Sequence, residues 1–297
     1  MGEVIVSTSK LKALADVIRL KSGKSELMTL DSMPRRIRLL PGRISNTINV
    51  SDLCRSGTPY APNVKLRAIP LLKTTGMTDM SSMFKDLNAA STVTATAANY
   101  IIDVSSLNTA SVTNMSSMFE GAKGDVEGIH VWDTSNVTNM SSMFKNFTVH
   151  NRANDYVRTI DLSDLDVSNV TDFSYMFSGF TFQFVVPDSL PCSYLDLNNF
   201  DTSSATTMEG MFNRFDAYDL DNYHIYLWVP STFVSTQISS SSLKPFYYGP
   251  SNKHSLSKLH VYTDATDAVS QGWGTIHSGF DMHYNSTHSD FLALVNS

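Results

Sequence analysis

Tyrosine, asparagine and histidine side chains that could hold a carbohydrate gather in one short stretch near the C-terminus. The stretch is FYYGPSNKH, residues 246–254, and its Gly-Pro pair predicts a turn or loop. Aromatic rings on a loop offer flat apolar faces, while amide and imidazole groups hydrogen-bond to hydroxyls. Core packing is the alternative explanation for such aromatics. The candidate receptor-binding residues are Tyr247, Tyr248, Asn252 and His254.

Histidines are concentrated in the same region, which raises the question of a metal. Five of the eight histidines lie between His254 and His288, but their spacing matches no standard zinc motif. We therefore expect no metal site and no cofactor, with a metal shared across the symmetry axis of an oligomer as the open alternative. Cys54 and Cys192 are far apart in sequence and are predicted to be buried free thiols rather than a disulfide.

Carboxylates could instead supply the acid and base of a glycoside hydrolase. The candidates recur, however, at turn positions of a repeated sequence, where Asp closes turns through local hydrogen bonds. The chain also contains no Gly-rich phosphate loop, no G-x-S-x-G and no H-E-x-x-H. We expect a protein that is not an enzyme, and turn formation as the role of Asp161, Asp164, Asp166 and Asp201.

The repeat that positions these residues is marked by Met-Phe pairs. They occur at spacings of 35, 25, 33 and 35 residues, a period that indicates a solenoid. One such unit cannot bury its own apolar face, but stacked units form a continuous core. The pairs end at Phe84, Phe119, Phe144, Phe177 and Phe212.

Each repeat predicts a strand, a turn and a short helix. Apolar residues alternate at its start, as at Leu195 and Leu197, which is typical of a strand. Thr-Asn or Thr-Asp then provides an N-cap for one or two helical turns. In such a helix Met115, Met118 and Phe119 share one face. We expect them to fill the core rather than to surround a metal or cofactor.

The expected fold is an α/β solenoid of leucine-rich-repeat-like strand–short-helix coils, with an N-terminal helical hairpin and an irregular, mainly β C-terminal cap. Residues 1–43 form a helical anchoring and oligomerisation segment, and residues 44–222 form the repeat solenoid with its N-terminal cap. Residues 223–297 form the C-terminal cap and the candidate receptor-facing region. Within it, segments 223–230 and 258–264 predict strands, and 264–274 could hold a short helix.

The repeat also resembles a known family. The pattern L-D-L-S-x-F-D-T-S-x-V-T-x-M-x-x-M-F is similar to BspA-like leucine-rich-repeat variants of bacterial and mycoplasmal surface proteins and some phage proteins. The resemblance covers about residues 70–215, with Phe173 and Ala205 in place of the usual Met and Val. It implies a scaffold for adhesion and recognition. The irregular spacing implies inserted loops, and segments 85–100 and 145–158 are candidate contact surfaces.

The first 43 residues differ from the remainder in charge. They contain nine Lys or Arg and four Asp or Glu, whereas residues 44–297 contain thirteen Lys or Arg and twenty-four Asp or Glu. An acidic body disfavours nucleic-acid binding. Two short helices are predicted here, and such a hairpin has little core of its own. It should therefore dock on symmetry mates or another protein. The anchoring and oligomerisation residues are Leu11, Leu14, Ile18, Met33 and Ile37.

The same segment resembles a motif at the start of tail and baseplate proteins of phages and prophages of Gram-positive bacteria. Residues 13–37 carry L-A-D-x-I-R-x-K-[ST]-G-K-[ST]-x-x-[LM]-T-L-x-x-M-P-x-x-I nearly whole. The resemblance implies that residues 1–43 attach the protein to the virion tail. The sequence shows no secretory signal and no apolar stretch of membrane-spanning length, which agrees with synthesis in the host cytoplasm.

Together these patterns predict a phage tail fibre or receptor-binding protein, located in the virion and present as a homotrimer. The expected partners are other tail or baseplate proteins and a host cell-surface polysaccharide or protein, without nucleic acid and without membrane insertion. Two alternatives stay open: a bacterial surface adhesin built on the same coils, and a purely structural tail or baseplate component.

Overall fold

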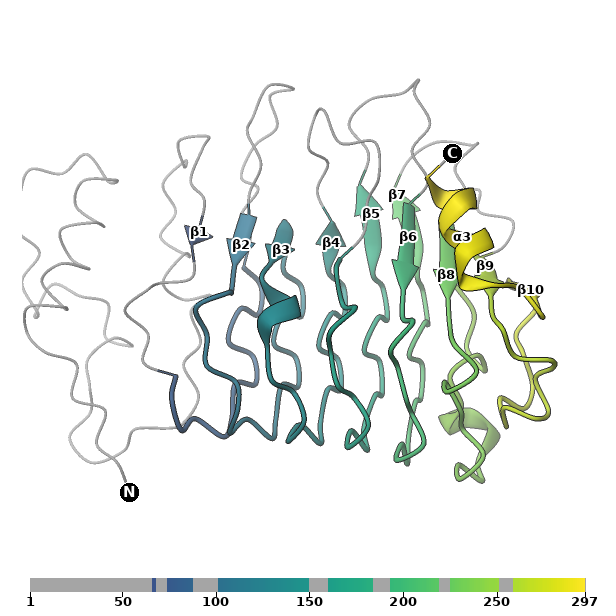
Figure 1. Ribbon diagram of the computed structural model, residues 1–297, viewed down its shortest axis with the longest axis horizontal. Coiled ribbons are helices and arrows are strands. Elements are labelled where there is room, and N and C mark those ends of the chain that lie inside the picture. Colours follow the sequence, from purple (N-terminus) through teal and green to yellow (C-terminus); the bar gives the residue numbers. More distant parts are fainter. Residues whose placement is uncertain are drawn as a thin grey trace, which may run out of the picture.

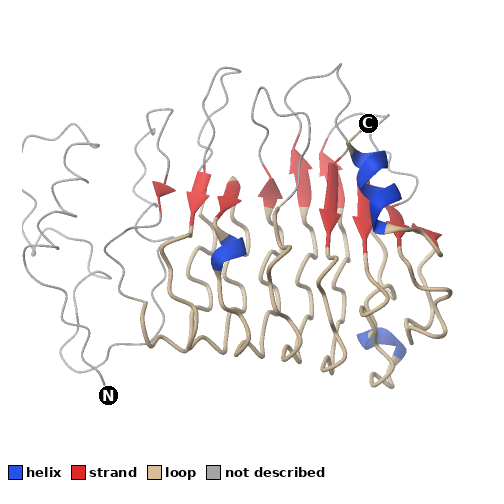
Figure 2. Cartoon of the chain, in the orientation of Figure 1, coloured by secondary structure: helices blue, strands red, loops and turns tan. Residues whose placement is uncertain are grey.

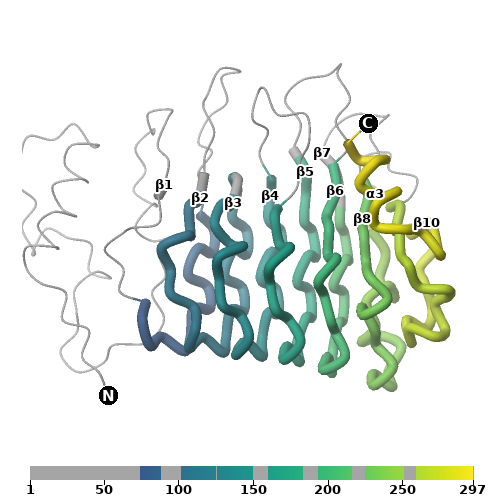
Figure 3. Tube along the Cα trace, in the orientation of Figure 1, coloured from purple at the N-terminus to yellow at the C-terminus, as the bar shows by residue number. Residues whose placement is uncertain are grey.

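The described part of the chain winds into coils that stack side by side along the long axis of the molecule (Figure 1). The computed structural model describes residues 66–67, 74–87, 101–149, 160–183, 193–218, 225–250 and 259–296. The Cα trace shows successive coils running parallel to one another from the N-terminal to the C-terminal side (Figure 3). The predicted helices of residues 1–43 and the cysteines Cys54 and Cys192 lie outside the described residues.

Among the described residues, ten short strands form three sheets, and every strand pair in these sheets is parallel. The sheets have the orders β1-β2-β3, β4-β5-β7 and β10-β9-β8-β6. Parallel neighbours need a long crossover between them, and here one coil supplies it. The strands are β1 (Leu66–Arg67), β2 (Ile101–Asp103), β3 (Asp125–Glu127), β4 (Thr148–Val149), β5 (Thr181–Gln183), β6 (Ser193–Asp196), β7 (Asp216–Tyr218), β8 (Ile225–Trp228), β9 (Leu259–Tyr262) and β10 (Phe280–His283).

Loops and turns make up most of each coil (Figure 2). The described helices are two 3-10 turns, η2 (Ile129–Val131) and η3 (Ser241–Leu243), and one α-helix, α3 (His288–Val295). The short helix expected in every repeat is absent from the described repeats, where consecutive turns occupy the Met-x-x-Met-Phe segment. The prediction of strand–short-helix coils is wrong in this respect.

Hydrogen bonding explains why this segment is not helical. Met83 N–H donates to the Met80 carbonyl within its own coil at 3.3 Å, but Phe84 N–H donates to the Met118 carbonyl of the next coil at 2.7 Å. The same alternation recurs in the following coils. An α-helix would direct all of these N–H groups to its own carbonyls. The inter-coil bonds therefore replace helical ones.

The backbone achieves this alternation by adopting the left-handed region at one position of each segment. The position carries φ of 55–59° in five coils. Short polar residues and glycine tolerate this conformation best. Four of the five residues there are Ser or Gly: Ser82, Ser117, Ser142, Tyr175 and Gly210.

A column of stacked phenylalanine rings runs through the core. Consecutive ring centroids lie 5.2–6.0 Å apart, with interplanar angles of 2–14°. Met115, Met118 and Phe119 have no exposed surface, so their predicted role in the core is confirmed. The column consists of Phe84, Phe119, Phe144, Phe177, Phe212 and Phe246.

The sixth ring of the column shows that coils continue past the boundary expected between residues 222 and 223. Phe246 occupies the repeat position although no Met precedes it. Strand β6 lies before the expected boundary, yet it shares one sheet with β8, β9 and β10. The predicted strands at 223–230 and 258–264 are confirmed as β8 and β9, whereas turns occupy 268–272 in place of the suggested helix.

Trp273 closes the described end of the core. Its ring meets Phe246 edge-on at 5.1 Å, and its indole N–H donates to the Phe233 carbonyl at 2.8 Å. Trp273 has no exposed surface. Phe280 also meets the Phe246 ring edge-on, at 5.2 Å, so two aromatic residues cover the last ring of the column.

Candidate functional site

The sheet formed by β6, β8, β9 and β10 has one face in the core and one face outside it. Alternate residues of the strands, such as Leu195, Leu227 and Val261, belong to the main core. The residues between them pair across the strands in two rows, because side chains alternate along a strand. The rows are Tyr194, Tyr226, His260 and Asp281, and Asp196, Trp228, Tyr262 and His283.

Helix α3 covers part of this outer face. Thr287 caps the helix by accepting a hydrogen bond from Asp290 N–H at 3.1 Å. Phe291 is buried and meets Trp228 at 5.5 Å and Tyr262 at 5.8 Å between ring centroids. His288 lies 2.8 Å from an Asp196 oxygen. The helix therefore forms a second, smaller core outside the coils.

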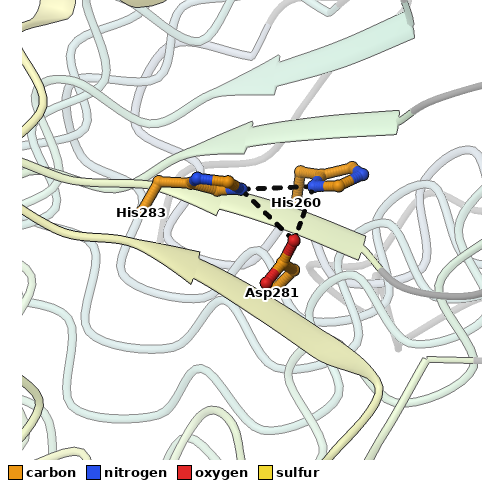
Figure 4. A group of neighbouring side chains, drawn as sticks. All are labelled: His260, Asp281 and His283. Carbon is orange, nitrogen blue, oxygen red and sulfur yellow. Dashed lines mark hydrogen bonds and ion pairs between the residues drawn. The ribbon is translucent and has the colours of Figure 1, made fainter.

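Two histidines and one carboxylate converge beside the covered part, on the last two strands (Figure 4). His260 Nδ1 lies 3.2 Å from His283 Nε2 and 3.2 Å from Asp281 Oδ2. His283 Nε2 lies 3.5 Å from the same carboxylate oxygen. Figure 4 shows the second nitrogen of each ring directed away from this meeting point. Two ring nitrogens and one oxygen thus face a common centre.

Tyr262 holds one of these rings in place. The His283 ring stacks on the Tyr262 ring with centroids 4.2 Å apart and an interplanar angle of 8°. Burial and, secondarily, the charge of Asp281 raise the pKa of Tyr262. The phenol therefore stays neutral at physiological pH and serves as a packing surface for His283.

Sequence spacing did not single out His260, Asp281 and His283. The signal that could have found them is the pair of tripeptides His-Val-Tyr at 260–262 and Asp-Met-His at 281–283. Residues two apart on a strand share one face, and the parallel register sets His260 opposite Asp281 and Tyr262 opposite His283. That register is a tertiary property which residue spacing along the chain does not contain.

The structure includes two of the four predicted receptor-binding residues. Tyr247 is 38% exposed, and the Tyr248 ring meets it edge-on with centroids 5.0 Å apart. The pair lies between Phe246 and Pro250, both buried. Asn252 and His254 lie outside the described residues, as do most of the two predicted contact insertions, 85–100 and 145–158.

Charged and polar side chains form a row beside the Phe column. Glu120 lies 2.7 Å from Lys85 and 3.7 Å from Lys145. Burial opposes ionisation of Glu120, but hydrogen bonds from Lys85 and Ser117 and the two lysine charges outweigh it and lower its pKa. These contacts join three successive coils at their surface.

Tyr175 continues this row in the next coil. Its hydroxyl donates to Glu209 Oε1 at 2.7 Å, and Lys145 lies over its ring at 5.6 Å. The hydrogen bond to Glu209, followed by burial and nearby negative charge, raises the pKa of Tyr175 to about 12. The row has the character of a surface ion network rather than of a reactive site.

The repeated aspartates close turns. Asp161, Asp166 and Asp201 each accept a hydrogen bond from the backbone N–H two residues later, at 3.0–3.1 Å. Such local bonds stabilise turns. The interpretation of these three residues as turn residues is therefore confirmed, and Asp164 also lies in a turn.

Stacked parallel coils with a repeated Met-Phe core define a repeat protein. Two overlapping stretches, residues 78–189 and 159–240, match the family model described as "Mycoplasma protein of unknown function, DUF285". Together they cover more than half of the chain, which therefore belongs to this family. No curated protein and no solved structure matched the chain. Among the described residues, no helix has the length and apolar character needed to cross a bilayer.

Proposed function

We propose that this protein is a phage tail fibre or receptor-binding protein in which a solenoid of coils displays a recognition surface for a host cell-surface polysaccharide. The observation that carries the recognition part is the Tyr247–Tyr248 pair. In the five preceding coils the residue after the column Phe is charged or polar: Lys85, Glu120, Lys145, Ser178 and Asn213. In the sixth coil that residue is Tyr247, an exposed aromatic.

Preorganisation supports a binding role for this pair. Phe246 is stacked on Phe212, and Pro250 is buried, so both ends of the short loop are tied to the core. A loop held in one conformation loses little entropy when it binds a ligand. Two rings at 85° to each other also present faces in two directions, which suits contact with a sugar chain.

Attachment to the tail through residues 1–43 is proposed on the N-terminal motif alone. A homotrimer would bring three copies of the loop together, and weak sites gain avidity when several bind one surface. Light scattering of the full chain tests the homotrimer, with three times the chain mass as the expected result. A monomer would contradict it.

The recognition part is tested with variants of the full chain and a panel of purified wall polysaccharides from Gram-positive bacteria. Tyr247→Ala should lower affinity about tenfold or more, which corresponds to about 1.4 kcal/mol. Tyr247→Phe should retain binding because the ring face remains. Val269→Ala is the matched control, since Val269 is a highly exposed apolar residue elsewhere in the C-terminal part.

Two results would decide against this proposal. If wild-type protein binds none of the polysaccharides or intact cells, a purely structural tail component takes its place. If Tyr247→Ala binds as tightly as wild type, recognition lies on another surface. Immunogold labelling then separates a virion protein from a bacterial surface adhesin, the alternative that uses the same coils.

A further inference from the structure

The outer face of β9 and β10 carries a cluster that receptor recognition does not use. Strand register places it there: His260 pairs with Asp281, and Tyr262 pairs with His283. On β9, Val261 lies between His260 and Tyr262 and is fully buried. Its two neighbours on the strand therefore point outward. The three side chains are therefore fixed by two parallel strands rather than by a loop.

The ligand atoms are spaced as a small cation requires. Their separations are 3.2, 3.2 and 3.5 Å among His260 Nδ1, His283 Nε2 and Asp281 Oδ2. Tetrahedral zinc with bonds of about 2.0–2.2 Å holds neighbouring ligand atoms about 3.3–3.6 Å apart. The cluster thus needs only small adjustments of its side chains to enclose such an ion.

The types of ligand select the class of ion. Imidazole nitrogen suits zinc, copper, iron and nickel, whereas calcium and magnesium prefer oxygen alone. Two imidazole nitrogens and one carboxylate oxygen are also a ligand set that proteins use for zinc, with a fourth position left open. We propose that His260, Asp281 and His283 bind one zinc-class divalent ion at the C-terminal end of the coil stack.

Exposure and packing agree with this assignment. The side chains of His260, Asp281 and His283 are 21%, 38% and 35% exposed, so an ion can reach them from solvent. The stacked Tyr262 ring restricts the rotation of His283, and the Tyr226 ring lies 5.7 Å from the ring of His260. Three protein ligands leave one tetrahedral position for water or an oxygen group from outside.

The ion would fasten the last strand to the stack. Strand β10 pairs only with β9 among the described strands, so it is a sheet edge. A metal bridge between β9 and β10 adds a bond that exists only in the folded protein, and ligands of this kind stabilise the fold. The inference stands without the proposed function, because ion binding is measured without a receptor.

The test uses untagged full-length protein stripped with EDTA and titrated with zinc chloride in a calorimeter. One ion per chain should bind, and His283→Gln should lower its affinity at least tenfold. Asp281→Asn, which keeps the shape of the side chain, should also weaken zinc binding. It provides the test if His283→Gln fails to fold. His130→Gln is the control, since His130 is an exposed histidine of η2, far from these strands in sequence.

Cobalt chloride provides a readout of geometry. A bound Co²⁺ should give the intense visible absorption of tetrahedral coordination in wild type and the His130 variant, and lose it in both site variants. Zinc should also raise the thermal midpoint of wild type but not of Asp281→Asn. No saturable zinc binding, or undiminished affinity in both site variants, would overturn the proposal.

Discussion

The coils of residues 74–218 and the end of the stack at residues 225–296 solve the same packing problem in different ways. In the first region the same types of residue recur in every coil, with one Phe in the column and one residue of positive φ per segment. In the second region individual residues replace the repeat: Trp273 packs on the last ring of the column, and α3 covers part of the outer face of the sheet.

The difference separates the residues that build the scaffold from those that are free to acquire function. A side chain inside the stack is constrained by copies above and below it, so a change affects two interfaces. Among the described strands of this end, β10 has a neighbour on one side only, and it carries Asp281 and His283. Both the Tyr247–Tyr248 pair and the His260–Asp281–His283 cluster belong to this second region.

The largest expected effect comes from removing one ring from the column. Phe144→Ala should lower the free energy of unfolding by about 3–5 kcal/mol, because the ring is fully buried and stacked on both sides. Phe291→Ala removes a ring of similar burial from the second core. It should expose the outer face of β6 and β8 while leaving the coils folded.

Urea unfolding measures the first effect, and hydrogen exchange across the chain distinguishes the two variants. Phe144→Ala should speed exchange in coils on both sides of residue 144. Phe291→Ala should speed it only near α3 and the strands beneath it. If both variants lost protection from hydrogen exchange equally along the whole chain, the coils of residues 74–218 and the end at residues 225–296 would not differ in this way.

A smaller effect should follow from the left-handed position of the repeat. Gly210→Ala should destabilise by about 1–3 kcal/mol, because φ is +59° and an added Cβ would lie 2.6 Å from the Tyr175 ring. Ser142→Gly at the equivalent position should be neutral or stabilise by up to about 1 kcal/mol. Thermal unfolding of both variants provides the measurement, and stabilisation by Gly210→Ala would refute this role of the position.

The smallest effect concerns the surface row. The raised pKa of Tyr175, about 12 against an ordinary 10.0, means that its hydrogen bond to Glu209 stabilises fully below pH 10 and is lost as the pH rises through 12. Because the group is largely exposed, solvent screening limits the contribution to less than about 1 kcal/mol. Tyr175→Phe should therefore show a shallower loss of stability than wild type between pH 10 and 12 in urea titrations. Identical slopes would assign the loss to other tyrosines.

Sequence periodicity predicted the core well because burial follows from residue type and spacing. Met115, Met118 and Phe119 were assigned to the core from their repeat alone, and all three are buried. The same spacing of three and four residues also suggested a helix, which the structure replaces with turns. Hydrogen bonds to the next coil decide between a helix and turns. The pattern of residues within one repeat contains no information about these bonds.

The candidate sites were harder to predict for a related reason. Tyr247 and Tyr248 could be named as candidates because aromatic residues beside a Gly-Pro turn are a local feature of the sequence. The stretch that contains them also holds Phe246, whose place in the column became apparent only from its stacking on Phe212. His260, Asp281 and His283 meet through strand register, which depends on the length of the loop between β9 and β10.

The backbone hydrogen bonds that pass from each coil to the next give the molecule a mechanical character. A pulling force along the stack axis loads these bonds in series, so the weakest interface yields first and the others stay closed. Each released coil of 25–35 residues would then extend by about 80–125 Å. Stretched between two surfaces, the protein would lengthen in discrete steps, and each step would absorb mechanical work.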